Sequence, residues 1–204
     1  EGSVRISSWP AHRLHDRKVT LNERAMFSDA GAAIYTLGVG EDLYLEHFVR
    51  WLMCRDVEYV IDTRSPPYAW NREEFAPGEL SGFLQVQGMK YIDMSKNLGD
   101  RPSDISLHTS MGRMDYRRYL KRPYAITGIN RIALAFTTGC RVCVIGREPN
   151  PIFSHHARLV GQGLQNRGII ARHISHMGNR LIPHPMLIRH IHLQYDSVHF
   201  SPET

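Results

Sequence analysis

The sequence predicts an α/β fold, a three-layer sandwich in which helices cover both faces of a mostly parallel sheet of about five strands. Three observations predict it. Short apolar runs recur along the chain, loops that carry glycine or proline follow them, and segments with apolar residues at helical spacing come next. Because alternating strands and helices need crossover connections, we expect the strands to lie parallel and to be covered on both faces.

The expected elements follow from this pattern in chain order. Strands are expected over residues 33–37, 59–62, 89–92, 142–145 and 169–173. Helices are expected around 45–52, over 72–86, over 114–120, around 129–136, and from a cap at Ser154 to Arg167. Gly88 and Gly168 are the expected helix ends, because glycine readily adopts the left-handed conformation that ends a helix.

Composition divides the chain into a basic N-terminal arm (1–30), an α/β domain (31–178) and a C-terminal tail (179–204). The arm lacks sustained apolar periodicity, so it is either a disordered leader or an arm that packs on the core or touches an anionic ligand. Its basic residues are Arg5, Arg13, Arg17, Lys18 and Arg24. The tail holds three prolines and one apolar stretch, which suits docking as one short helix.

The composition favours one globular domain with an anionic partner. The chain has 204 residues, 42% of them hydrophobic, a formal net charge of +5 and a pI near 9.3. Such a charge favours nucleic acid or nucleotides as partners, and solubility is the alternative reason for it. Three cysteines form no disulfide framework, and no window approaches the ~18 apolar residues of a membrane span. We therefore expect a cytoplasmic protein without membrane contact and make no prediction of its oligomeric state.

Two carboxylates stand where parallel strands are expected to end, which is where α/β folds bind ligands. Asp62 directly follows the apolar pair Val60-Ile61, and Arg64 comes two residues later. This pair suits acid/base chemistry or a substrate clamp, or alternatively forms an internal ion pair that fixes the loop. Glu148 follows the strand that ends at residue 145 in the same way, with a solvated loop carboxylate as the alternative.

His155 and His156 lie at the start of an expected helix, where one of them can contact phosphate or shuttle a proton. Adjacent helical residues diverge by about 100°, so both cannot point at one ligand, and a surface histidine is the alternative for the weaker candidate. The twelve histidines and the lone Cys140-x-x-Cys143 make no ligand set of zinc-site spacing. No metal and no cofactor are therefore expected.

Known nucleophile and phosphate-loop motifs are absent from the sequence. A catalytic thiolate at a strand end would occupy the position of Gly146, which argues against a rhodanese-like or phosphatase-like cysteine mechanism. The chain has no Gly-x-x-x-x-Gly-Lys, and Gly38-Val39-Gly40 is only a fragment of a dinucleotide fingerprint.

Several motifs in order resemble the domain-of-unknown-function family 488 (DUF488) over about residues 33–174. Ile34-Tyr35-Thr36-Leu37-Gly38 is similar to the family's Ile-Tyr-Thr-Ile-Gly-His-Ser, and Ile61-Asp62-Thr63-Arg64-Ser65 to its Val-Asp-Val-Arg-Ser. The other similar segments are Trp70-Asn71, Gly88-Met89-Lys90-Tyr91, Leu98-Gly99-Asp100, Gly146-Arg147-Glu148, Pro151, His155-His156-Ala157 and His173-Ile174.

The resemblance implies the fold and the site without naming a reaction. The retained family residues are Asp62, Arg64, Ser65, Tyr91, Glu148 and His156. The replaced positions are Val39 for a histidine, Gly146 and His155 for two cysteines, and Ala157, next to Arg158, for an arginine. The chain therefore resembles a divergent member that has lost any thiol chemistry of the family.

The sequence thus predicts an enzyme that acts on nucleic acid or a nucleotide by carboxylate-assisted cleavage or transfer at a glycosidic bond, as in base excision or base modification. The candidate catalytic residues are Asp62, Glu148 and His156. The candidate ligand-binding residues are Arg64, Ser65, Tyr68, Trp70, Asn71, Arg147, His155 and Arg158. The alternatives are a non-catalytic nucleic-acid or nucleotide (modified base) binding module and a scaffold protein without a deep pocket near Asp62.

Overall fold

The computed structural model describes residues 31–66, 72–175 and 180–195, with the backbone alone for 192–195. The strands are β1 (Ala33–Gly38), β2 (Tyr59–Asp62), β3 (Lys90–Asp93), β4 (Arg141–Gly146), β5 (Arg172–Ile174) and β6 (Leu181–Pro183). The helices are α2 (Leu45–Met53), α3 (Pro77–Val86), α4 (Ser95–Leu98), α5 (Tyr116–Tyr119), α6 (Pro123–Thr137), α7 (Gln162–Gln165) and α8 (His184–Tyr195). Shorter turns are η2 (Glu73–Phe75), η3 (Ile105–Leu107) and the π-helical η4 (Ala157–Gly161).

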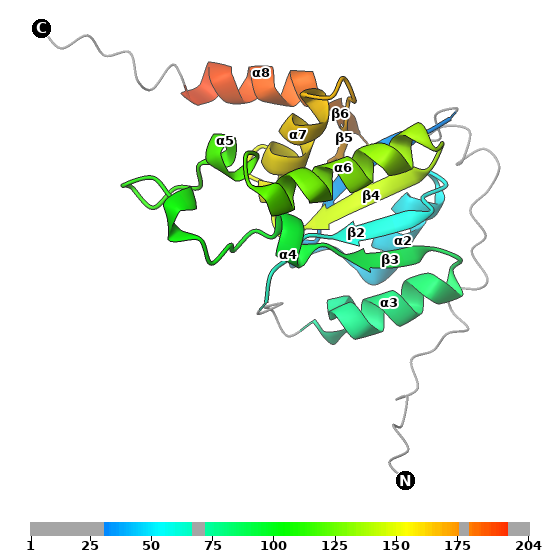
Figure 1. Cartoon of the computed structure of the whole chain (residues 1–204). Helices are drawn as coiled ribbons and strands as arrows, with labels where there is room; N and C mark the ends of the chain where they lie inside the picture. The colour runs from blue at the N-terminus through cyan, green and yellow to red at the C-terminus, as the bar shows by residue number, and fades with distance from the viewer. Residues whose placement is uncertain (1–30, 67–71, 176–179, 196–204) are drawn as a thin grey trace, which may run out of the picture.

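The six strands form one sheet in the order β3-β2-β4-β1-β5-β6, with helices on both faces (Figure 1). All neighbouring strands run parallel except β5 and β6, which are antiparallel. The predicted α/β sandwich with a mostly parallel sheet is confirmed. The expected number of about five strands was one too low.

The sixth strand comes from the segment that the sequence assigned to a C-terminal tail. Ile182 pairs with His173, and Leu181 with Ile174, before α8 begins. A three-residue strand that ends in Pro183 carries almost no periodic signal, and proline is tolerated only because β6 lies at the sheet edge. The apolar stretch that follows it forms α8, the one helix that the tail was expected to supply.

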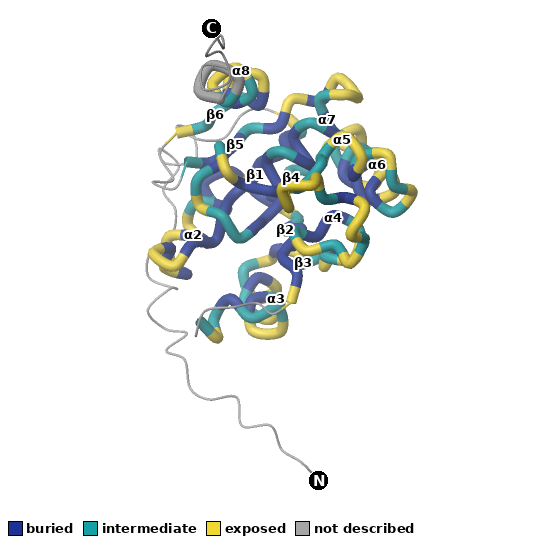
Figure 2. Tube along the Cα trace, turned by 90° about the vertical axis from the view of Figure 1, so that its left-hand side faces the viewer, coloured by how far each residue is buried: buried dark blue, intermediate teal, exposed yellow. Residues whose placement is uncertain are grey.

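Two apolar layers hold the sheet between its helices. Alternate residues of the central strand β1, such as Tyr35 and Leu37, pack with α2 and α3, whereas Ile34 packs with α6 and η4. Every residue of β1 is buried, which fits a central parallel strand covered on both faces. Figure 2 shows these strands as the dark-blue interior, with exposed residues along the outer sides of the helices.

The chain leaves neighbouring strands β1 and β4 toward opposite faces. After β1 it enters α2 on one side of the sheet, and after β4 it enters η4 and α7 on the other. The loops 39–44 and 147–154 touch at the carboxyl ends of the two strands and then lead to opposite faces of the sheet. Such a switch point in the topology is where open α/β sheets form their ligand crevice.

Local sequence signals explain the main boundaries. Gly88 and Gly168, with φ of 78° and 75°, end α3 and α7 as expected. The helix expected over 72–86 begins only at Pro77, because proline suits the first turn and residues 73–75 form a separate 3₁₀ turn. Among the described residues, no helix is long and apolar enough to span a membrane.

Candidate functional site

Asp62 and Arg64 form a buried ion pair at the end of β2. Asp62 Oδ1 accepts hydrogen bonds from Arg64 N and Nε, both at 2.9 Å. Its Oδ2 accepts from Arg64 Nη2 at 2.6 Å and from Tyr91 Oη at 2.7 Å. The guanidinium also donates to the Phe75 carbonyl at 2.8 Å. The two side chains are only 1% and 5% exposed.

This geometry is that of the internal ion pair, which the sequence left open as an alternative to a catalytic role. Oδ1 of Asp62 accepts two hydrogen bonds and Oδ2 accepts three, the third from Arg64 Nε at 3.1 Å, so neither oxygen has a free lone pair directed at a substrate. Burial, followed by the charge of Asp62, raises the pKa of Tyr91, so the phenol keeps its proton and remains a donor. Arg64 likewise donates its hydrogen bonds to groups inside the protein, Asp62 and the Phe75 carbonyl.

A second ion pair joins the loops after β2, α4 and β4. Asp100 Oδ1 accepts from Ser65 N at 2.8 Å, and its Oδ2 accepts from Arg147 Nε at 2.9 Å. Arg147 Nη2 closes the ring on the Ser65 carbonyl at 2.8 Å. Burial opposes ionisation, but the hydrogen bonds from Ser65 and Arg147 leave the pKa of Asp100 below its ordinary value. Ser65 and Arg147 thus brace the rim of the sheet.

Sequence reasoning did not single out Asp100, although it lies in a segment that resembles the family. The signal that could have found it is its position after the short helix α4, at the same edge as Arg147. Its partner could not be chosen from spacing, because 47 residues separate the two side chains.

Glu148 and His156 approach each other on the α6 side of the sheet. Glu148 Oε2 accepts from the His155 backbone N at 3.3 Å and lies 3.9 Å from His156 Nδ1. The Glu148 side chain is 34% exposed, and partial burial raises its pKa. A carboxyl of this kind holds its proton more readily than a solvated one, which suits a general acid.

His156 is completely enclosed. Burial, followed by the neighbouring His155, lowers its pKa to about 3, so the ring is neutral near pH 7. Its ring lies directly on Gly146, where an added Cβ would come within 1.9 Å of Nδ1. Nδ1 makes no hydrogen bond within the described part of the chain. Gly146, which stands where a catalytic cysteine would be expected, therefore leaves the space that the His156 ring occupies.

His155 is also buried, so neither histidine is the surface residue that the sequence allowed as an alternative. Its Nε2 lies 3.1 Å from the Leu98 carbonyl, which can only accept, so Nε2 carries the proton. Its ring packs against Tyr116 and Tyr119, with centroids 5.5 and 5.6 Å away. Burial lowers its pKa to about 4, so it cannot hold an anion as a cation near pH 7.

Arg158 belongs to the same side of the sheet. Its Nε donates to the Ile152 carbonyl at 3.0 Å, which fixes the loop before the helix. Burial raises the pKa of the nearby Tyr116 to about 12, although the positive charge of Arg158 opposes the shift. Ser154 Oγ accepts from Ala157 N at 3.1 Å and is the expected helix cap.

The structure therefore divides the predicted site residues between the two faces. The Asp62 side chain and its partner Tyr91 lie on the α2 and α3 side, as Val60 does. Glu148 and His156 lie on the opposite side, because Gly146 alternates with Ile145, which faces α2. Tyr68, Trp70 and Asn71 lie outside the described residues.

A further buried histidine pair lies beyond β1. Thr36 Oγ1 is 2.7 Å from His173 Nδ1, and His173 Nε2 is 2.9 Å from His184 Nδ1. His173 and His184 are fully buried, and the pair joins β5 to the start of α8. Within residues 31–66, 72–175 and 180–195, no three His, Cys, Asp or Glu side chains are placed to hold a metal ion.

An open cavity of about 830 Å³ lies at the switch point between β1 and β4. Its lining residues are Gly38, Gly40, Asp42, Leu43, Tyr44, His47, Arg50, Trp51, Pro149 and Asn150. Asp62 and Glu148 are not among them. The sequence pointed to the glycines of this loop but missed Tyr44, His47 and Trp51, whose spacing along one helix was the available signal.

The search of protein-family models, of curated proteins and of solved structures found no match to this chain. The similarity to family 488 therefore stays a prediction, and the function has to be argued from the fold and its surfaces.

Proposed function

We propose that this protein binds nucleic acid through the side of the sheet that α5 and α6 cover. One observation carries the proposal, the separation of charge along the chain. Residues 31–100 hold 11 carboxylates and 6 Lys or Arg, whereas residues 101–195 hold 3 carboxylates and 14 Lys or Arg. A cluster of basic side chains on one face is the electrostatic footprint of a polyanion partner.

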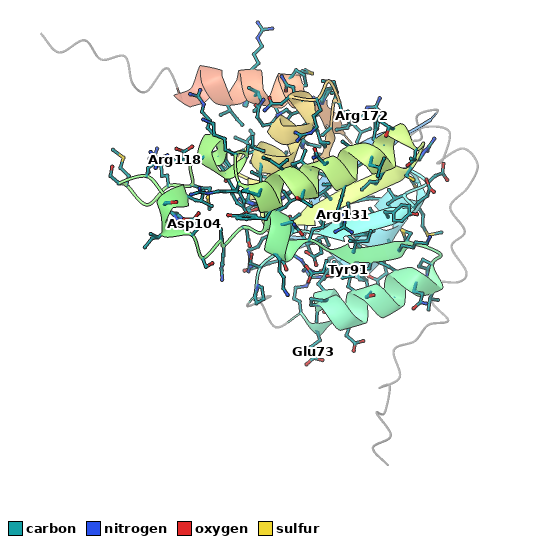
Figure 3. The ribbon with its side chains drawn as sticks, viewed as in Figure 1. Glu73, Tyr91, Asp104, Arg118, Arg131 and Arg172 are labelled. Carbon is teal, nitrogen blue, oxygen red and sulfur yellow. The ribbon has the colours of Figure 1, made fainter. Side chains whose placement is uncertain are left out.

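The fold turns this separation along the sequence into a separation in space. The acidic segment supplies α2 and α3, which cover one face of the sheet. The basic segment supplies α5, α6 and α7, which pack on the opposite face together with the short helix α4. Figure 3 shows Arg118 and Arg131 on the side of α5 and α6, with Glu73 on the far side near α3. The exposed cations of α5 and α6 therefore lie on the side of the sheet opposite the acidic helices α2 and α3.

Three exposed cations on this face are suited to phosphate contacts. Arg117, Lys121 and Arg131 are exposed, and the described residues show no ion pair for any of them. By contrast, Arg118 pairs with Asp115 at 3.2 Å and Arg122 with Asp104 at 2.8 Å. We name Arg117, Lys121 and Arg131 the basic triad. Binding through it would be sequence-independent, because phosphate contacts carry no base information.

The salt dependence of binding tests the proposal. Fluorescence anisotropy with duplex DNA of about 20 base pairs, from about 50 to 300 mM salt, gives the slope of log K against log salt. Replacing the triad with glutamines should reduce that slope by about 3, since each lost phosphate contact removes about 0.9. The matched control exchanges charge for charge, Arg117→Lys, Lys121→Arg and Arg131→Lys, and should keep the slope.

Two results would overturn the proposal. The first is no binding of DNA or RNA of either strandedness at about 50 mM salt, where phosphate contacts are strongest. The second is a slope that the glutamine variant leaves unchanged.

Glycosidic-bond cleavage is a second candidate, favoured by the half-buried Glu148 with its raised pKa. Its carboxyl could protonate a leaving group, and His156 Nδ1, 3.9 Å away, could exchange a proton with it. In this mechanism Glu148→Gln abolishes release of free base from DNA, RNA or nucleosides, while binding to the basic triad persists. If the wild-type protein releases no base from any of these substrates, the binding function stands alone.

A further inference from the structure

The cavity at the switch point has an aromatic wall, of which Tyr44 and His47 are exposed and Trp51 is half-buried against the core. Tyr44, His47 and Trp51 follow one another along α2, with ring centroids 5.9 Å and 6.3 Å apart. The core face of the same helix consists of Leu45, Phe48, Val49 and Leu52. Tyr44 is 66% exposed, and His47 is exposed as well. Exposed rings that line an open cavity, such as Tyr44 and His47, are typical of a ligand surface.

The opposite wall is held close by glycines. An added Cβ at Gly38 would come within 1.8 Å of the Glu148 carbonyl oxygen, and one at Gly40 within 2.9 Å of Pro149. Only glycine allows the loop after β4 to approach the end of β1 this closely. The cavity is therefore shaped by backbone contact between the two loops of the switch point.

The loop that carries the cavity's first residues is fixed in place by Arg72. Its Nη1 donates to the carbonyls of Gly40 and Glu41, both at 2.8 Å, and its Nη2 donates to the carbonyl of Leu43. The Arg72 guanidinium also lies 4.5 Å above the Phe75 ring centroid. A loop held at three carbonyls needs little further ordering when a ligand binds, which favours affinity.

The charges around the cavity disfavour an anionic ligand. Asp42 lines it, and the exposed Glu41 and Glu46 lie close to Asp42 and Tyr44 in the chain. Arg50 adds positive charge to the same lining, which disfavours a cation. The planes of His47 and Trp51 lie 13° from parallel, and the Tyr44 ring stands at 88° to that of His47. A cage for a methylated ammonium needs several ring faces turned toward one centre, whereas the near-parallel pair offers a flat surface. A flat, uncharged ligand fits this wall best.

We propose that this cavity binds a nucleoside whose base stacks on the nearly parallel rings of His47 and Trp51, with the Tyr44 ring, at 88° to His47, as a side wall. Base stacking on aromatic side chains is sequence-tolerant and strong, and 830 Å³ is within the range of small-molecule sites. Asp42 accepts a hydrogen bond from an amino group of the base, so adenosine, guanosine and cytidine bind better than uridine. The site faces the α2 side and does not depend on nucleic-acid binding by the basic triad.

Calorimetric titration of the full chain with the four nucleosides and their 5′-monophosphates tests the proposal. Nucleosides should bind more tightly than the monophosphates, and Trp51→Ala should weaken binding by about 10-fold or more. Asp42→Asn should reduce the difference in affinity between each nucleoside and its monophosphate, because it removes the charge that repels phosphate. The control variant is Phe153→Ala, which removes an exposed ring outside the cavity and should bind as wild type.

Thermal melts of each variant show whether it is folded. If Trp51→Ala is unstable, Tyr44→Ala provides a second test of whether the aromatic side chains bind the nucleoside. The proposal is overturned if no nucleoside binds at millimolar concentration, if Trp51→Ala and Tyr44→Ala bind as wild type, or if tetramethylammonium binds in place of nucleosides. Tighter binding of the monophosphates overturns the uncharged-ligand claim. The glutamine variant of the basic triad should keep its nucleoside affinity, which separates this test from that of the proposed function.

Discussion

Replacing Asp62 by asparagine should destabilise the protein by about 3 to 5 kcal/mol. The carboxylate accepts four hydrogen bonds from Arg64 and one from Tyr91, and it neutralises a guanidinium that is 95% enclosed by the protein. Asparagine keeps the volume but removes the charge, and it turns an NH₂ group toward donors that need an acceptor. The free energy of unfolding from urea titration measures the loss.

Two variants sharpen this measurement. Asp93 is the register partner of Asp62 on β3 but is exposed, so Asp93→Asn should cost less than about 0.5 kcal/mol. Adding Arg64→Met to Asp62→Asn should restore part of the stability, because it removes the stranded charge. A loss below about 1 kcal/mol for Asp62→Asn would refute the ion-pair reasoning and return Asp62 to the candidate catalytic residues.

Three further predictions concern the other buried groups. Gly146→Ala should destabilise the protein by about 1 to 3 kcal/mol in urea titration, because the new Cβ meets the ring of His156. The control Gly82→Ala has open space around its Cβ and should stabilise α3. Equal effects of the two substitutions would refute the packing argument. Asp100 ionises more readily folded than unfolded, so its contribution is full above its ordinary pKa of 3.8 and is lost as the pH falls below that value; Asp100→Asn should remove this part of the acid transition seen by circular dichroism. Burial lowers the pKa of His184 to about 4, so the free energy of unfolding should fall as the pH drops from about 6.5 to 4. His184→Gln should make this pH dependence shallower. An equally steep dependence in that variant would contradict the assignment.

The order of strands and helices was readable because burial imposes a period on the sequence. The central strands β1, β2 and β4 are apolar runs, and α2 shows its core face as Leu45, Phe48, Val49 and Leu52. Gly88 and Gly168 marked two helix ends for the same local reason, their access to positive φ. Strand β6 was missed because three residues carry no such period and become a strand only by pairing with β5.

At the candidate site, the sequence placed the residues but only the tertiary structure showed what they do. Spacing placed Asp62 and Arg64 at a strand end but could not choose between a ligand clamp and an internal ion pair, because both need the same residues in the same order. Burial decides that question, and burial depends on Tyr91 and Phe75, which lie 11 or more residues away in the chain.

By itself the sequence determined the layered α/β architecture, the strand ends that carry polar residues, and the uneven distribution of charge along the chain. Only the tertiary structure decided which face each group joins. Asp62 ends β2 with its side chain on the face of Val60, because side chains alternate along a strand. Glu148 lies in the loop after β4 and approaches His156, whose ring packs on Gly146 at the opposite face. The aromatic row of α2 likewise became a cavity wall only when the loops after β1 and β4 diverged beside it. Periodicity is a property of short segments and can be found in the sequence, whereas a site forms from segments that lie far apart in the chain.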